Sequence, residues 1–266
     1  MESLSGKTIL LYAEQGLGDT IQFCRYVQLV ASLGAKVILE VQRPLVPLLR
    51  GLAGVESLIA KGDQLPEFDY QCPLMSLPLA FKTDLNSIPV SQRYLEAQAQ
   101  RVVYWRERLK SNKFKIGISW QGSQTSKIDI GRSFELSRFE KIAQLPNVQL
   151  ISLQKGYGTE QLKTMPVGME VMDLGGQMDA EGAFLDSAAV MMNLDLVITS
   201  DTALAHLAGA LGVKTWVALK YVPDWRWMLD RDDSPWYPSI KLFRQQELDE
   251  WTPVFEQIFS ELNLKI

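Results

Sequence analysis

The sequence predicts an α/β protein built from two Rossmann-like parallel-sheet domains that face a cleft. Short apolar runs, typical of strands buried on both faces, alternate with helical patterns along the chain. This alternation starts again after a charged segment that ends at residue 110. We therefore expect an N-terminal domain over residues 1–110, a C-terminal domain over 111–245 and a closing C-terminal helix over 246–266.

The elements of the first domain follow from local patterns. Residues 7–13 form a continuous apolar run that predicts a buried strand, and residues 19–33 predict a helix that ends at Gly34. Two further strands are predicted over 36–41 and 55–59, with a short helix over 44–50 between them. Prolines obscure the pattern from 69 to 89, and residues 94–110 predict a charged helix.

The second domain repeats this organisation. Strands are predicted over residues 114–120, 148–153, 170–174, 195–199 and 214–219, and helices over 137–144, 181–193 and 202–211. A proline- and tryptophan-rich stretch over 221–238 precedes a last helix over 246–262. Ligands of open parallel sheets bind beyond the carboxyl ends of the strands, so the loops at these ends are the candidate site.

Composition excludes several functional classes. The chain has 266 residues and a net charge of -4, which offers no basic surface for nucleic acid or an anionic membrane. Two cysteines and one histidine are too few for a structural zinc site. The chain holds no run of about 20 apolar residues and no apolar signal core near Met1, so we expect a cytoplasmic protein without a transmembrane segment.

The loop after the first predicted strand contains Gly16, Gly18 and Asp19. It resembles a dinucleotide-binding glycine motif, but Ile21 stands where the third glycine would be. Asp19 would also direct a carboxylate to the helix end where a pyrophosphate should lie, so an NAD-dependent enzyme is a distant alternative. Asp19 either caps the helix or faces the cleft as a general base.

The segment 195–219 is the most informative one. A buried strand ends at Thr199, and Ser200, Asp201 and Thr202 are all suited to cap the helix that follows. The free N–H groups and the positive dipole end of that helix can hold a phosphate. His206 lies one turn further on, either as a packing residue or as part of this anion site.

The run DLVITSDTALAHLAGALG over 195–212 resembles the C-terminal signature of heptosyltransferase-type glycosyltransferases of the GT-B fold. The resemblance is closer to the catalytic-like domain of bacterial tetratricopeptide-repeat proteins, which are relatives of the O-linked N-acetylglucosamine transferases. The run GLGDTIQF over 16–23 also belongs to that pattern. Further matching blocks follow in the expected order, at residues 118–120, 132–133, 152–156, 224–227 and 234–238.

This resemblance implies inverting transfer of a sugar from a nucleotide-sugar donor to an acceptor hydroxyl, without a metal or another cofactor. It assigns the acceptor-activating base to Asp19 and the donor diphosphate site to Asp201, Thr202 and His206. The heptosyltransferase pattern reads Asp-Thr-Gly, whereas this chain has Ala203 in place of the glycine. The acceptor, which is a protein, a glycan or a lipid, stays open. The resemblance also implies tetratricopeptide repeats in a longer chain or a complex.

The departing diphosphate needs positive charge, which Lys127, Arg132 and Lys155 can supply from loops after predicted strands. Gln154 ends a strand and can contact a base or a ribose. The candidate donor-binding residues are therefore Gly18, Arg132, Gln154, Lys155, Asp201, Thr202, Ala203 and His206. Candidate sugar or base contacts are Trp120, Asp224 and Arg226. Two alternatives remain, a nucleotide-sugar-binding module without turnover and a nucleotide-sugar epimerase.

Overall fold

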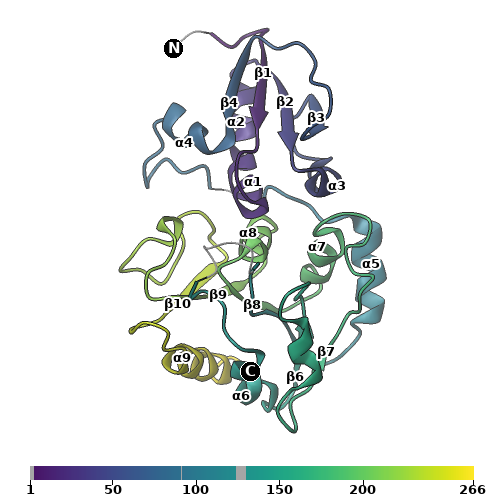
Figure 1. The fold of residues 1–266 in the computed structure, drawn as a ribbon, viewed down its shortest axis with the longest axis vertical. Helices are drawn as coiled ribbons and strands as arrows, with labels where there is room; N and C mark the ends of the chain where they lie inside the picture. Colours follow the sequence, from purple (N-terminus) through teal and green to yellow (C-terminus); the bar gives the residue numbers. More distant parts are fainter. Residues whose placement is uncertain (1–2, 91, 124–129) are drawn as a thin grey trace.

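The computed structural model describes residues 3–90, 92–123 and 130–266. Two separate parallel sheets lie one above the other along the long axis of the molecule, and the helices α1 and α8 meet between them (Figure 1). The predicted α/β class with two parallel sheets is confirmed. No helix in the described part of the chain combines the length and apolar content that crossing a membrane requires.

The N-terminal sheet has four parallel strands in the order β3-β2-β1-β4. The strands are β1 (Thr8–Tyr12), β2 (Lys36–Val41), β3 (Ser57–Ala60) and β4 (Tyr70–Pro73). The helices that accompany them are α1 (Leu17–Phe23), α2 (Val27–Ser32), α3 (Val46–Leu49) and α4 (Leu77–Ala80). A 3₁₀ turn over Cys24–Tyr26 divides the single helix that was predicted over 19–33 into α1 and α2.

The C-terminal sheet has six parallel strands in the order β10-β9-β8-β5-β6-β7. The strands are β5 (Phe114–Ser119), β6 (Val148–Ser152), β7 (Val171–Met172), β8 (Leu196–Ser200), β9 (Thr215–Leu219) and β10 (Ile240–Arg244). The helices are α6 (Glu140–Ala143), α7 (Leu185–Met191), α8 (Ala203–Ala210) and α9 (Thr252–Asn263). The strands β4 and β10 were not predicted from the sequence.

Helix α5 (Ala99–Arg108) connects the two sheets along the chain. The sequence placed it in the first domain, but it packs against α7 of the C-terminal sheet (Figure 1). The side chains of Arg101 and Trp105 both donate to the Asp186 carboxylate at the start of α7. Its apolar face therefore covers the C-terminal sheet, and the chain already reaches that sheet before residue 110.

One apolar core extends across both sheets. It contains Leu11 and Phe23 from the N-terminal part and Leu207 and Tyr237 from the C-terminal part, all buried. A second core lies on the other face of the C-terminal sheet, where Ile118 packs with buried side chains of α6 and α9, among them Phe255. The first core holds the carboxyl ends of the two sheets together, and this is the region where the candidate site lies.

Candidate active site

A cleft of about 680 Å³ opens where α1 of the N-terminal part meets α8 of the C-terminal part. Its walls come from the loops after β1, β5, β6 and β8, at the carboxyl ends of the strands, as the parallel topology leads one to expect. The cleft brings together nearly all the predicted site residues: Gly18, Asp19, Arg132, Gln154, Lys155, Asp201, Thr202, Ala203, His206, Asp224 and Arg226.

Gly18 lets the two helices approach closely. A Cβ atom at this position would lie 2.9 Å from Cδ2 of His206 and 3.3 Å from Cα of Ala203. The first of these distances is shorter than the contacts that Cβ atoms make in real protein structures. A side chain at Gly18 would therefore push α1 and α8 apart. The glycine therefore sets the width of the cleft at this point, and Ala203 is the residue that it packs against.

Asp19 is held from both sides of the cleft. Its Oδ2 accepts the Gly16 N–H at 2.9 Å, which caps α1, and its Oδ1 accepts from the Arg226 guanidinium in an ion pair. The same guanidinium lies 2.8 Å from the Asp224 carboxylate. Arg226 is buried, and it bridges one carboxylate of each half of the molecule. The carboxylate of Asp19 therefore faces the cleft in a fixed orientation.

The N-terminus of α8 opens into the cleft. Thr202 is the N-cap residue and has an extended backbone, with φ -135° and ψ 176°. Its hydroxyl is buried and finds no hydrogen-bond partner among the described residues. Burial raises the pKa of the neighbouring Asp201 above its ordinary value, and the charge of Asp224 adds to this, while Arg132 and Arg226 act in the opposite direction. The helix end thus offers N–H groups and an unused hydroxyl to a ligand.

His206 lies on the same helix one turn inside the cleft. Its ring stacks on Trp227, with centroids 5.4 Å apart, and Nδ1 lies 3.0 Å from the Tyr237 hydroxyl. Burial, together with the charges of Arg226 and Arg25, lowers its pKa from 6.5 to about 3. The imidazole is therefore neutral at pH 7. His206 was expected either to pack in the interior or to line the anion site, and its ring is both buried and part of the cleft wall.

Gln154 and Trp120 differ from their expected roles. The Gln154 carboxamide is buried, accepts the N–H groups of Trp120 and Gln121, and donates to the carbonyls of Gln121 and Tyr157. These hydrogen bonds fix the loop after β5 and leave the carboxamide little hydrogen-bonding capacity for a base or a ribose. Trp120 is fully buried and its indole donates to Gly158, so the prediction of a sugar or base contact is wrong for Trp120.

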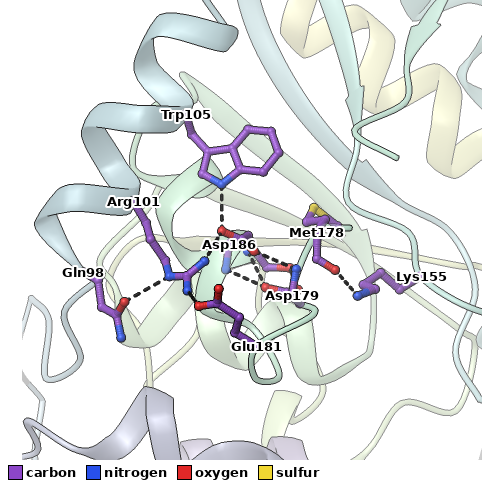
Figure 2. Close-up of polar contacts among 9 residues, drawn as sticks. Gln98, Arg101, Trp105, Lys155, Met178, Asp179, Glu181 and Asp186 are labelled. Carbon is purple, nitrogen blue, oxygen red and sulfur yellow. Dashed lines mark hydrogen bonds and ion pairs between the residues drawn. The ribbon is translucent and has the colours of Figure 1, made fainter. Parts of the chain in front are cut away.

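Two of the expected cations lie in the described part of the cleft. Arg132 is part of its lining, and Lys155 donates to the backbone carbonyl of Met178 across it. Lys127 lies outside the described residues. Lys155 thus joins the loop after β6 to the loop before α7, as Figure 2 shows.

Asp179, which was not predicted from the sequence, lines the cleft and caps α7. Its carboxylate accepts the Ser187 N–H at 2.9 Å and also the N–H of Asp186, while the Asp179 N–H donates to the Asp186 carboxylate (Figure 2). Asp186 in turn accepts from Arg101 and Trp105 of α5. The sequence could have indicated the capping role, because an aspartate shortly before a helix is typical of an N-cap. The position of Asp179 in the cleft depends on how the loop folds and has no sequence signal.

The tryptophan-rich stretch forms a folded loop. Trp236 is buried, and Trp225 is exposed on one face while it stacks on Phe23 with centroids 6.5 Å apart. The Arg226 guanidinium lies 5.0 Å from the Trp225 ring. The loop therefore carries Asp224 and Arg226 into the cleft and anchors them on the N-terminal half. No group of three or more His, Cys, Asp or Glu residues in the described ranges is placed to hold a metal ion.

Two parallel sheets that face one cleft, with a free helix N-terminus on one side and a carboxylate on the other, define the class of GT-B-like sugar-transfer folds. The sequence pattern of glycosyltransferase family 9 (heptosyltransferase) matches residues 79–219, and the chain belongs to this family.

Comparison with solved structures gives the same fold. A glycosyl transferase family 9 protein from Veillonella parvula superposes with a TM-score of 0.70 at 13% identity, covering 100% of this chain and 99% of that one. The ADP-heptose lps heptosyltransferase II of E. coli superposes with a TM-score of 0.66 at 14% identity, covering 97% and 98%.

Among curated proteins, Protein FlbA of Caulobacter vibrioides is 26% identical over 98% of this chain. The match covers 47% of FlbA, so the chain spans about half the length of this relative.

Proposed function

We propose that this protein transfers a sugar from a nucleotide-sugar donor to an acceptor hydroxyl, with inversion and without a metal. The observation that carries the proposal is the pairing of two features across one cleft. The N-terminus of α8 presents the Thr202 hydroxyl, which has no hydrogen-bond partner among the residues that the structure describes, and Asp19 faces it from α1. A site for a departing diphosphate and a base for an incoming hydroxyl are the two requirements of this chemistry.

The donor diphosphate would lie at the N-terminus of α8. The N–H groups of Ala203 and Leu204 and the Thr202 hydroxyl would bind its oxygens. Arg132, Lys155 and Arg226 would oppose the negative charge that grows as the sugar departs. The buried Nε of Arg226 has no hydrogen-bond partner in the described part of the chain, so it can donate to a ligand without losing a bond.

Asp19 would act as the general base. Each of its oxygens accepts one hydrogen bond, from Gly16 and from Arg226, and each retains a lone pair. The acceptor hydroxyl would give its proton to Asp19 as its oxygen forms a bond to the anomeric carbon. The bond from that carbon to the diphosphate oxygen would break on the opposite face, which inverts the configuration.

The solved relatives, rather than contacts in the cleft, support the choice of donor class. The E. coli neighbour is an ADP-heptose lps heptosyltransferase, and we propose that the donor here is an ADP-linked or related nucleotide sugar. The acceptor, the association with tetratricopeptide repeats and the cytoplasmic location remain predictions from the sequence. FlbA extends well beyond the matched region.

The replacement of Asp19 by Asn tests the base. We expect Asp19→Asn to bind ADP at least as tightly as the wild type, because Arg226 loses a competing carboxylate. The release of ADP from ADP-heptose should fall by about 10²–10⁴-fold, the usual contribution of a general base. Bound ADP at ~100 times its Kd adds about 2.7 kcal/mol of stability, which thermal unfolding detects.

Asp69→Asn is the matched control. This carboxylate is exposed, pairs with Lys7 and lies before β4, at the end of the sheet away from the cleft. Equal losses of binding and turnover in Asp19→Asn, or no loss of turnover, would contradict the role of Asp19. A wild type that binds ADP but neither hydrolyses nor transfers the sugar would support the alternative of a binding module. Interconversion of two nucleotide sugars without ADP release would support the epimerase alternative.

A further inference from the structure

The segment 234–238 was singled out by the sequence and is not used by the proposed mechanism. The structure places its Tyr237 beneath α8, with the almost fully buried ring in contact with Gly209. Gly209 lies one turn after His206 on the same face of the helix. The absence of a side chain at Gly209 therefore leaves the space that the Tyr237 ring fills, and its hydroxyl reaches His206.

The hydrogen bond between Tyr237 and His206 has a preferred direction. The Tyr237 hydroxyl lies 3.0 Å from Nδ1 of His206. Beside the Tyr237 ring lie the guanidinium of Arg25, which can only donate, and the Tyr94 hydroxyl. The Tyr94 hydroxyl gives its own proton to the Ile21 carbonyl at 2.9 Å, and its oxygen already accepts from Arg25 at 3.1 Å. The imine nitrogen of His206 is thus the acceptor for the Tyr237 proton. The reverse direction would leave the buried Tyr237 proton only the Tyr94 oxygen, which Arg25 already occupies, as an acceptor.

Arg25 fixes this arrangement from the N-terminal half of the molecule. It is buried, donates to the Trp236 carbonyl at 2.7 Å and to the Tyr94 hydroxyl at 3.1 Å, and lies 4.5 Å from the centroid of the Tyr237 ring. Its positive charge also opposes protonation of His206, as does that of Arg226. His206 is therefore held as a neutral ring with one N–H group.

We propose that Tyr237 is a positioning residue that holds His206 in its Nε2–H tautomer, so that His206 donates a hydrogen bond to a diphosphate oxygen of the donor. This inference rests on the proposed function. The Cδ2 edge of the ring, next to Nε2, faces Gly18 in the cleft. A diphosphate oxygen only accepts hydrogen bonds, so the Nε2–H form binds it, whereas the other tautomer would present a lone pair to it.

His206 is the single histidine of the chain, which makes the tautomer directly measurable. Protein labelled with ¹⁵N at histidine gives one pair of ring nitrogens in a long-range ¹H–¹⁵N spectrum at pH 7. We expect an unprotonated Nδ1 and a protonated Nε2 in the wild type. Tyr237→Phe removes only the hydroxyl, so we expect a mixture of the two tautomers and an affinity for ADP up to about tenfold lower.

Tyr26→Phe is the matched control, because Tyr26 is also fully buried and its hydroxyl bonds to Thr83 at 3.0 Å, away from His206. It should keep both the tautomer and the affinity of the wild type. An Nδ1–H tautomer in the wild type, an unchanged tautomer in Tyr237→Phe, or an equal loss of ADP affinity in Tyr26→Phe would overturn the inference. Failure of the wild type to bind ADP would instead refute the proposed donor site, because the spectrum reports the role of Tyr237 separately.

Discussion

The contact between α1 and α8 makes Gly18→Ala the most direct perturbation of the cleft. Two effects of opposite sign compete in this variant. Alanine in place of glycine within a helix stabilises it by about 0.5–1 kcal/mol. The added methyl group would lie 2.9 Å from His206 and 3.3 Å from the backbone of Ala203, and overpacking of this kind costs about 1–3 kcal/mol.

The overpacking cost should exceed the gain, because the ring of His206 is fixed by Trp227 and Tyr237 and the backbone of α8 cannot yield alone. We expect Gly18→Ala to lower the free energy of unfolding by about 1 kcal/mol in a urea titration. The affinity for ADP should fall as well, because the helix ends that line the cleft move apart.

Gly51→Ala is the control for this experiment, because a methyl group there meets no atom within 4 Å. It should leave the free energy of unfolding unchanged or raise it slightly. If Gly18→Ala were more stable than the wild type, by the amount that helix propensity alone predicts, the reasoning about a tight contact between α1 and α8 would be refuted.

Two further predictions concern stability. The pKa of His206 is lowered to about 3, so between pH 6.5 and 3 the unfolded chain binds a proton that the folded chain does not, and the free energy of unfolding falls as the pH falls. His206→Asn should lose a slope of up to about 1.4 kcal/mol per pH unit in this window, and equal slopes in urea titrations would contradict the burial of the ring. Asp186→Asn should cost about 1–3 kcal/mol in the same assay, because Arg101 and Trp105 lose a buried ionised acceptor. A loss no greater than that of Asp63→Asn, which breaks an exposed ion pair, would argue against this network.

All the strands with two neighbours were predicted from the sequence, and so were the edge strands β3 and β7. β1, β2, β5, β6, β8 and β9 are buried apolar runs, and each was predicted within two residues of its observed ends. The two strands that were missed, β4 and β10, both lie at sheet edges. An edge strand contacts a single neighbour, so its sequence needs fewer apolar residues and its signal is weaker.

The candidate site was predictable where it depends on strand ends. The residues of the loops after β1 and β8 meet in the cleft because parallel strands share one carboxyl edge. Trp120 shows the limit of this reasoning. Side chains alternate along an extended chain, so Ser119 and Gln121 line the cleft while Trp120 joins Ile118 in the core behind it.

Contacts between distant segments could not be predicted from the sequence. Tyr237 meets His206 across 31 residues of sequence, and Arg25 meets the Trp236 carbonyl across 211. Helix α5 was predicted as a charged helix, and its sequence does not indicate which of the two sheets its buried face covers. These contacts depend on how the two halves of the molecule pack, and no local sequence pattern predicts them.

The apolar core that runs through both halves bears on any attempt to dissect the protein. A cut at residue 110 would leave α5 on the N-terminal fragment, separated from its packing partner α7. The buried guanidinium of Arg25 would also lose its hydrogen bond to the Trp236 carbonyl. Neither fragment would retain a closed interior. We therefore expect the two sheets to unfold as one cooperative unit, and calorimetry of the intact chain should show a single unfolding transition that moves as a whole when a nucleotide binds.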